Sequence, residues 1–259
     1  MSSKSKPAKF DSAGIIVPAL VIIIWCFVPK AAGVPAYIVP PFPDIIAGLA
    51  DFIFGFLKIN IYSGTLFGHL SASMVRVLNG FSIAAVLGLT FGYLSGCNSV
   101  FYRLFNPIIN FLRTIPGIAW LPISIVWFGI GERQSIFLIS LAAFFPVYTN
   151  TCHGVLSIDE ELIAVLKIYG VNPVQNFRYA IFPLSLQNAL VGLRIGLGLS
   201  WAYLVLGEMT GVNKGIGAVM QDARMLGQNQ MIIVCMLVIA LTAIVFDKLM
   251  LRLIKIFSR

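Results

Sequence analysis

The chain has 259 residues, of which 59% are hydrophobic and only 11% charged. Ordinary globular domains carry about 25% charged residues, so this composition excludes a typical soluble domain. The formal net charge of +8 also occurs in nucleic-acid-binding proteins, but here the basic residues are scattered near the ends of apolar segments, as the positive-inside rule describes for membrane proteins. We therefore predict an all-α integral membrane protein of about six transmembrane helices, with no nucleic acid among its partners.

The N-terminal region, residues 1–63, is predicted to hold the first transmembrane helix and a second, shorter helix. The apolar run Ala13–Val28 is followed by no small-residue cleavage site, so we interpret it as an uncleaved span with its N-terminus in the cytoplasm. The segment Pro29–Pro43 is too rich in proline for regular structure. Apolar positions at helical spacing follow up to Lys58. They predict an amphipathic helix, either at the outer interface or packed on the rest of the domain.

The predicted second span, Leu66–Gly96, carries small residues every four positions, which places them on one helix face. These residues are Gly80, Ala84, Gly88, Gly92 and Gly96. Such a stripe lets two membrane helices approach closely, so it predicts helix packing. Arg76 lies in the outer half of this span. Because a charge at the bilayer centre costs about 2.5–3.5 kcal/mol, Arg76 is expected to snorkel or to pair.

A polar hinge is predicted at Cys97–Arg103, followed by an apolar segment that is interrupted by Pro107, Pro116 and Pro122. The segment therefore cannot be one regular helix. Broken helices at membrane depth persist where protein or a water-filled cavity satisfies the freed backbone groups, and they often mark a substrate route. The pathway candidates from this segment are Arg113, Thr114, Trp120 and Ser124. An anchor at the cytoplasmic end of the span is an equal alternative for Arg113.

After a predicted outer turn at Glu132-Arg133 and a fourth span over Gln134–Thr151, the chain becomes polar. A helical pattern from Ser157 stops at Gly170, restarts after Asn172-Pro173 and stops again at Pro183. A polar segment between membrane spans is expected to lie in water. Two short helices held at a fixed angle by these stops predict a docking surface for a soluble partner.

The predicted fifth span, Leu184–Met209, supplies the remaining pathway candidates: Arg194, Ser200, Trp201, Tyr203 and Glu208. An ionisable residue inside a membrane span is a functional candidate by default, although Glu208 near the outer end would also serve as a structural cap. Arg194 and Glu208 stand about 21 Å apart along a helix, so they cannot pair within it. A glycine-rich outer loop with a short helix, a sixth span over Met231–Met250 and a basic tail complete the chain.

Several motifs in order resemble one family. The run G-V-N-P-V-Q-N-F-R-Y-A-I-F-P from Gly170 to Pro183 resembles the EAA loop of membrane permeases in bacterial ABC importers. The runs F-L-R-T-I-P-G-I-A-W-L-P-I-S-I-V-W-F-G-I-G-E and G-L-R-I-G-L-G-L-S-W look like the nitrate/sulfonate/taurine branch. The resemblance implies a type I ABC importer permease-like core over residues 64–259 with a cytoplasmic coupling loop at 154–184. The implied ATPase-coupling residues are Glu160, Glu161, Ala164, Lys167, Gly170, Val171, Asn172, Pro173 and Pro183.

One part of the loop departs from the family pattern. The family places Glu-Ala-Ala six to four positions before the loop glycine, where this chain has Ala164-Val165-Leu166. The acidic residues Glu160 and Glu161 lie about one helical turn upstream. Two interpretations stay open: these carboxylates replace the missing glutamate, or this branch tolerates apolar residues there.

The resemblance also implies partners and a substrate class. These are a second permease copy, two ATP-binding subunits, an extracytoplasmic substrate-binding protein and membrane lipid, with nitrate, a sulfonate, taurine or a similar organic anion as cargo. The chain lacks a Walker-type phosphate loop. We therefore expect no enzymatic activity and no cofactor in this chain, with ATP and Mg bound by the partner ATPase.

Charge placement and two alternatives complete the prediction. With both termini in the cytoplasm of a bacterial inner-membrane protein, most basic residues lie on the inner side. An ion-coupled secondary transporter also uses broken helices, but it needs intramembrane carboxylates, and few exist beyond Glu208 and Asp247. An intramembrane enzyme is disfavoured because no predicted span carries paired acids, a histidine cluster or a Ser/His pair at useful spacing. The four cysteines form no C-x-x-C motif, so no metal site is predicted.

Overall fold

The computed structural model describes residues 16–17, 20, 23–27, 33, 35, 37–58 and 61–257, apart from the side chains of residues 167 and 257. Much of the predicted span Ala13–Val28, and Arg259, lie outside the described residues. Within them every regular element is a helix. Four helical segments are long and apolar enough to cross a membrane, and a bent pair makes a fifth. The prediction of an all-α membrane protein is confirmed.

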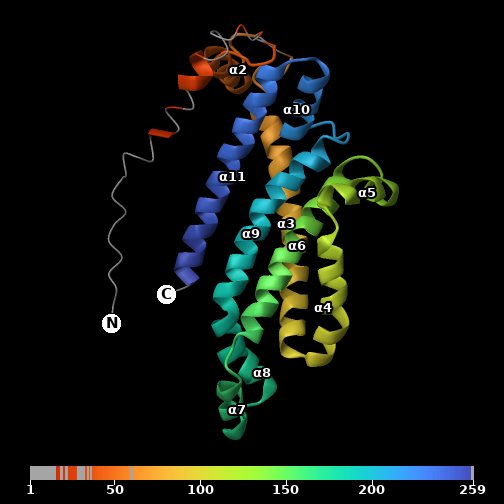
Figure 1. The fold of residues 1–259 in the computed structure, drawn as a ribbon, viewed down its shortest axis with the longest axis vertical. Coiled ribbons are helices and arrows are strands. Elements are labelled where there is room, and N and C mark those ends of the chain that lie inside the picture. The colour runs from red at the N-terminus through yellow and green to blue at the C-terminus, as the bar shows by residue number, and fades with distance from the viewer. Residues whose placement is uncertain are drawn as a thin grey trace.

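The centre of the molecule consists of α3 (Leu66–Cys97), α6 (Glu132–Leu156) and α9 (Phe182–Glu208), which pack along most of their lengths (Figure 1). The small-residue stripe of α3 is what permits this. A Cβ added at Gly88 would lie 2.8 Å from the side chain of Val147, and one at Gly92 would lie 2.7 Å from Thr151. The stripe therefore packs α3 against α6 of the same chain, as predicted.

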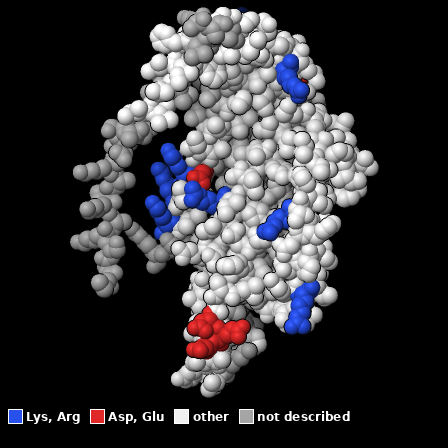
Figure 2. Space-filling model, in the orientation of Figure 1, with Lys and Arg blue, Asp and Glu red and all other residues white. Residues whose placement is uncertain are grey.

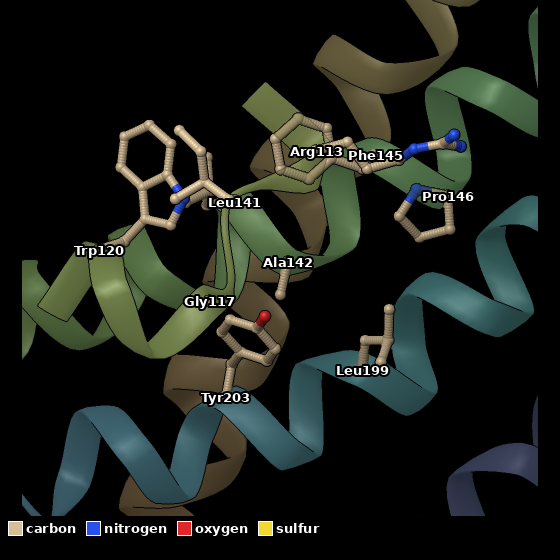
Figure 3. Close-up of a pocket in the computed structure, with 10 residues that line it drawn as sticks. Arg113, Gly117, Trp120, Leu141, Ala142, Phe145, Pro146, Leu199 and Tyr203 are labelled. Atoms are coloured by element: carbon tan, nitrogen blue, oxygen red, sulfur yellow. The ribbon is translucent and has the colours of Figure 1, made fainter. Parts of the chain in front are cut away.

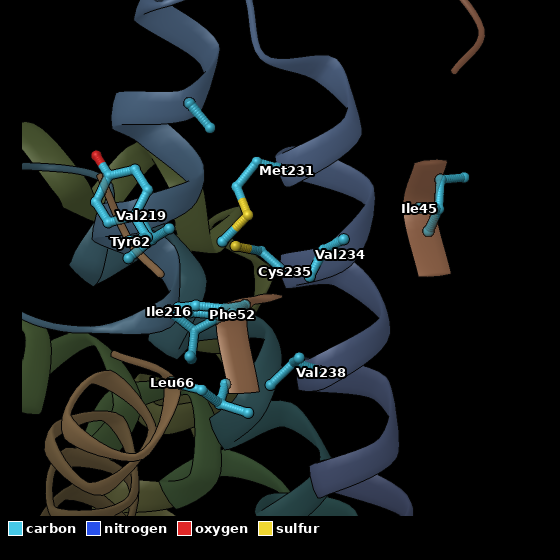
Figure 4. Packing of buried hydrophobic residues seen from close by; sticks show 11 residues of the cluster. Ile45, Phe52, Tyr62, Leu66, Ile216, Val219, Met231, Val234, Cys235 and Val238 are labelled. Carbon is cyan, nitrogen blue, oxygen red and sulfur yellow. The ribbon is translucent and has the colours of Figure 1, made fainter. Parts of the chain in front are cut away.

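An apolar cluster lies at one end of the molecule (Figures 1 and 4). It is enclosed by α2 (Phe42–Phe54), α10 (Ile216–Met225) and the start of α11 (Asn229–Phe257). Phe52 and Met231 lie in this cluster and are each 1% exposed. The predicted amphipathic helix is α2, and it packs on the rest of the domain, which was one of the two predicted alternatives.

Polar contacts close this end. The buried carboxylate of Asp51 accepts hydrogen bonds from the backbone N–H groups of Leu57 and Lys58, at 2.9 and 2.8 Å, and so closes the turn after α2. The Tyr62 hydroxyl donates to Asp222 of α10 at 3.1 Å. Burial, together with this carboxylate, raises the pKa of Tyr62 to about 12, so the hydroxyl remains a donor at neutral pH.

The predicted hinge at Cys97–Arg103 is wrong. One residue separates α3 from α4 (Ser99–Thr114), because the side chain of Asn98 accepts hydrogen bonds from the backbone N–H groups of Val100 and Phe101. Such an N-cap satisfies the free donors of the new helix, so no longer linker is needed.

The predicted break in the next segment is confirmed, but a single proline makes it. The pair formed by α4 and the segment Gly117–Phe128, which contains the short η1 turn and α5 (Trp120–Phe128), is bent by 90°. Pro116 lies at the bend, whereas Pro107 lies inside α4 and Pro122 in the first turn of α5, where proline is tolerated.

The predicted outer turn at Glu132-Arg133 is also misplaced. Glu132 is the first residue of α6, and the chain turns at Gly129 and Gly131 instead. Their φ/ψ angles of +73°/174° and +128°/−145° lie in a region that essentially only glycine adopts, which is why the turn falls there.

At the opposite end of the molecule lie α7 (Glu160–Ile168) and the four-residue α8 (Pro173–Asn176) (Figure 1). Gly170 ends the first helical stretch with a φ of +75°. Asn172 and Gln175 form a capping box at the start of α8. The predicted second stop at Pro183 is wrong. A π-helical turn joins α8 to α9, and Pro183 occupies the first turn of α9, where a missing N–H is tolerated.

Candidate functional site

A cavity of about 240 Å³ lies where the break between α4 and α5 meets α6 and α9 (Figure 3). Its walls include Arg113, Trp120, Phe145, Pro146, Leu199 and Tyr203. Gly117 also lines it, and a side chain at this position would overlap the ring of Tyr203. The absence of a Cβ at Gly117 therefore allows the broken segment to approach α9 closely.

The polar side-chain groups of this cavity are donors. The indole Nε1 of Trp120 is buried and has no hydrogen-bond partner within the described part of the chain. Arg113 forms no ion pair there. Its guanidinium points to the side of the cavity away from Trp120, and the Tyr203 hydroxyl points towards Gly117 (Figure 3). No carboxylate lines the cavity. An unpaired cation and a buried unpaired N–H favour an anion over a cation in this space.

Four other predicted pathway residues do not line the cavity, namely Thr114, Ser124, Ser200 and Trp201. Each of the three hydroxyls donates to a backbone carbonyl of the preceding helical turn, at 2.7–2.9 Å. The ring of Trp201 is 3% exposed and packs on Phe246 of α11, with their centroids 5.4 Å apart. These residues support helix packing, and of the nine pathway candidates only Arg113, Trp120 and Tyr203 line the cavity.

The two charged candidates of α9 each pair with another helix. Arg194 forms a bidentate ion pair with Asp247 of α11, with N–O distances of 2.6 and 2.9 Å. Glu208 forms an ion pair with Arg76 of α3. The expectation that Arg194 and Glu208 do not pair with each other is confirmed, and of the two alternatives predicted for Arg76 the structure shows pairing.

The group around Glu208 joins four helices at the end of the molecule where α10 lies. Its carboxylate also accepts hydrogen bonds from the Ser73 hydroxyl at 2.7 Å and from the backbone N–H of Gly217 at 2.8 Å. The guanidinium of Arg76 also binds Glu132, at the start of α6, through Nε at 2.6 Å. The pairing of Arg76 with Glu208 was not predicted from the sequence. Their shared position near the outer ends of two spans was the available signal.

The predicted coupling residues lie at the opposite end. Those on α7 are Glu160, Glu161, Ala164 and Lys167, those in the turn and on α8 are Gly170, Val171, Asn172 and Pro173, and Pro183 begins α9. The side chain of Lys167 lies outside the described residues. An acidic patch over α7, formed by Asp159, Glu160 and Glu161, is exposed (Figure 2).

Large apolar side chains accompany this acidic patch. Ile168 is 84% exposed, Tyr169 81% and Val174 75%. Ile168 and Val174 belong to α7 and α8, which extend beyond the ends of α3 and α6 (Figure 1), and Tyr169 lies in the turn after α7. An apolar group rimmed by charges and placed outside the packed bundle is typical of a protein–protein contact. No group of three or more metal-ligating side chains occurs among the described residues.

Comparison with known proteins is consistent with this geometry. A family described as "Binding-protein-dependent transport system inner membrane component" matches residues 84–259. The chain is 34% identical to the putative aliphatic sulfonates transport permease protein SsuC of Bacillus subtilis, over 90% of this chain and 82% of that one. It is 30% identical to the taurine transport system permease protein TauC of Escherichia coli, over 88% and 82% of the two chains.

A solved structure of the MetNI methionine ABC transporter shares the fold, with a TM-score of 0.66 and 21% identity over 75% of this chain and 96% of that one. The predicted type I importer permease fold is thereby confirmed. The family match, the related permeases and the apolar helices together establish the class of this molecule. The chain belongs to the binding-protein-dependent transport system inner-membrane components, and it is a multi-pass permease subunit of an ABC importer.

Proposed function

We propose that this permease forms the pathway for a small organic sulfonate, taurine or nitrate-like anion delivered by an extracytoplasmic binding protein. Two copies form a homodimer, and each copy binds one ATP-binding subunit. ATP and Mg are bound and ATP is hydrolysed in those subunits, since this chain has no Walker-type loop. The substrate class is supported by the names of the related permeases and by the unpaired donors of the cavity.

The observation that carries the proposal is the exposed acidic and apolar surface of α7 and α8. The segment from Pro173 to Glu208 forms one helical unit of 36 residues, which passes through the π turn without a break. A displacement of α8 by a bound ATPase is therefore transmitted along α9 to Leu199 and Tyr203 at the cavity. The coupling region 154–184 and the substrate cavity are thus mechanically continuous.

In this mechanism the cavity binds its anion only transiently. Arg113 attracts the anion, while Trp120 and the Tyr203 hydroxyl offer hydrogen bonds, and the apolar walls weaken binding. ATP drives transport only if the two end states of the transporter bind the ATPase dimer with different affinities. The contact of Gly117 with Tyr203 is the constriction that opens and closes as α9 moves against the break.

The proposed topology places α7 and α8 in the cytoplasm and α10 on the outer side, facing the binding protein. Both termini then lie in the cytoplasm. We propose that residues 1–63 form a first transmembrane helix and an outer amphipathic segment, which precede a permease core at 64–259. The carboxylates that an ion-coupled transporter would use, Glu208 and Asp247, are both paired with arginine.

The coupling role is tested with Gly170→Asp. A side chain at Gly170 meets no atom within 4 Å, and aspartate adopts a positive φ more often than most residues do, so a charge enters the docking surface with backbone strain that the control below shares. We expect copurification of the ATPase subunit and its stimulation by loaded binding protein in liposomes to fall about tenfold, which corresponds to about 1.4 kcal/mol.

Gly227→Asp is the matched control. Gly227 has a φ of +69° and equally open surroundings, but it lies in the turn after α10 at the other end of the molecule. The control is expected to copurify with the ATPase subunit as the unsubstituted chain does. Full ATPase binding and full stimulation in Gly170→Asp would show that this surface does not couple the two subunits.

A further inference from the structure

A second hollow lies between α3, α5 and the first half of α6. It is a groove of about 590 Å³, within the size range of small-ligand sites. Its apolar walls include Ile83, Leu87, Phe91, Phe128, Phe137 and Phe144. The hydroxyl of Ser140 also lines it, but this group already donates to the carbonyl of Ile136 at 2.7 Å. Because the interior offers no other polar side chain, an occupant of the groove has to be apolar along its length.

The groove has the length of one lipid leaflet. Its positions on α6 run from Arg133 to Phe144, about 16 Å at 1.5 Å per residue, and those on α3 from Ile83 to Phe91, about 12 Å. Half of a bilayer's hydrocarbon core is about 15 Å thick. The groove follows the axes of two membrane-spanning helices, starting where α6 begins. An acyl chain lying parallel to these helices fits this shape.

A single cation stands at the end of the groove. Arg133 is the second residue of α6 and is exposed, and it is the one charged residue in the lining. It forms no ion pair with any described residue. The neighbouring carboxylates Glu132 and Glu208 are both bound to Arg76. Arg133 is therefore free to bind an external anion at the depth where a span leaves the hydrocarbon.

We infer that this groove binds one acyl chain of an anionic phospholipid, with the lipid phosphate on Arg133. The apolar interior, the leaflet-length shape and the terminal cation together match an amphipathic ligand with a negative head and a long tail. A second copy of this chain is the other occupant that the groove could take, and the sizing experiment below distinguishes it from lipid.

The test uses the intact permease–ATPase complex, purified in mild detergent and stripped of lipid. Phosphatidylglycerol and phosphatidylcholine with identical chains are titrated separately, and bound lipid is counted by native mass spectrometry. One basic residue near a membrane surface supports about a fivefold preference for the anionic lipid. We expect that preference in the unsubstituted complex and in Arg133→Lys, and its loss in Arg133→Gln. The matched control Arg103→Gln, on α4 and outside the groove, is expected to keep it.

A second variant tests the groove itself. Leu87→Trp fills the space between α3 and α6, so we expect it to reduce the binding of both lipids. Equal binding of the two lipids by the unsubstituted complex would overturn the proposal, as would an unchanged preference in Arg133→Gln. If Leu87→Trp leaves lipid binding unaltered but separates the two permease copies on sizing, the groove is a protein interface and the proposal is wrong.

Discussion

Two arginines, Arg76 and Arg194, bind carboxylates of other membrane-spanning helices, and the surroundings of their pairs with Glu208 and Asp247 differ sharply. In the pair of Arg76 with Glu208 the side chains are 2% and 0% exposed, and Ser73 and the N–H of Gly217 complete the carboxylate's hydrogen bonds. In the pair of Arg194 with Asp247 they are 42% and 43% exposed. Removing one partner leaves a buried charge in the first case and a solvated charge in the second. The first pair therefore stabilises the packing of the helices at the α10 end, while the second is a weaker interaction between α9 and α11.

The largest expected effect follows from Arg76→Met. This change leaves Glu208 buried without its cation, and breaking a buried pair in this way costs about 3–5 kcal/mol. We expect a strong fall in the thermal stability of the detergent-purified chain and in its amount in the membrane. Arg103→Met is the control, since Arg103 is exposed and forms no ion pair among the described residues.

The double variant Arg76→Met/Glu208→Gln separates the lost charge pair from lost packing. Without a buried charge, the chain is expected to recover part of the stability that Arg76→Met removes. If the double variant is no more stable than the single one, the packing of Arg76, and not its charge, carries the effect.

A smaller effect is expected from Ser73→Ala. The Ser73 hydroxyl accepts a hydrogen bond from the backbone N–H of Ile216 at 2.9 Å and donates to Glu208 at 2.7 Å. Its loss leaves a buried N–H without its partner, at a cost of about 1–3 kcal/mol. The first amides of α10 should then exchange hydrogen faster, which mass spectrometry of deuterated peptides measures. Unchanged exchange at Ile216 would mean that Ser73 does not hold α10.

Features with local signals were predictable from the sequence. Pro116 breaks the segment between α4 and α5, the four-residue spacing of glycine and alanine packs α3 on α6, and Gly170 ends α7, because each depends on backbone chemistry within a few residues. The predicted stop at Pro183 was wrong, because a π turn leads into α9 just before this proline and nothing in the composition indicates that turn.

The predicted site residues divide along the same line. Arg113, Trp120 and Tyr203 line the cavity because the break brings α4 and α5 against α6 and α9. Glu208 does not line the cavity. Its carboxylate instead binds Arg76, which lies 132 positions away in the chain. Partners so distant in sequence are set by helix packing, and with one sequence only a shared depth in the membrane could have suggested this pair.

The smallest effect on stability is expected from Asp247→Asn. Water or lipid headgroups can solvate Arg194 once its carboxylate is gone, because nearly half of the Arg194 side chain is already exposed. We therefore expect a loss of thermal stability smaller than that of Ser73→Ala. Raising the salt concentration should reduce it further, since exposed charges are screened. A loss as large as that of Arg76→Met would mean that this pair is buried in the assembled transporter. In that case the difference in exposure between the two ion pairs would exist only in the isolated chain, and α11 would contact another subunit in the transporter.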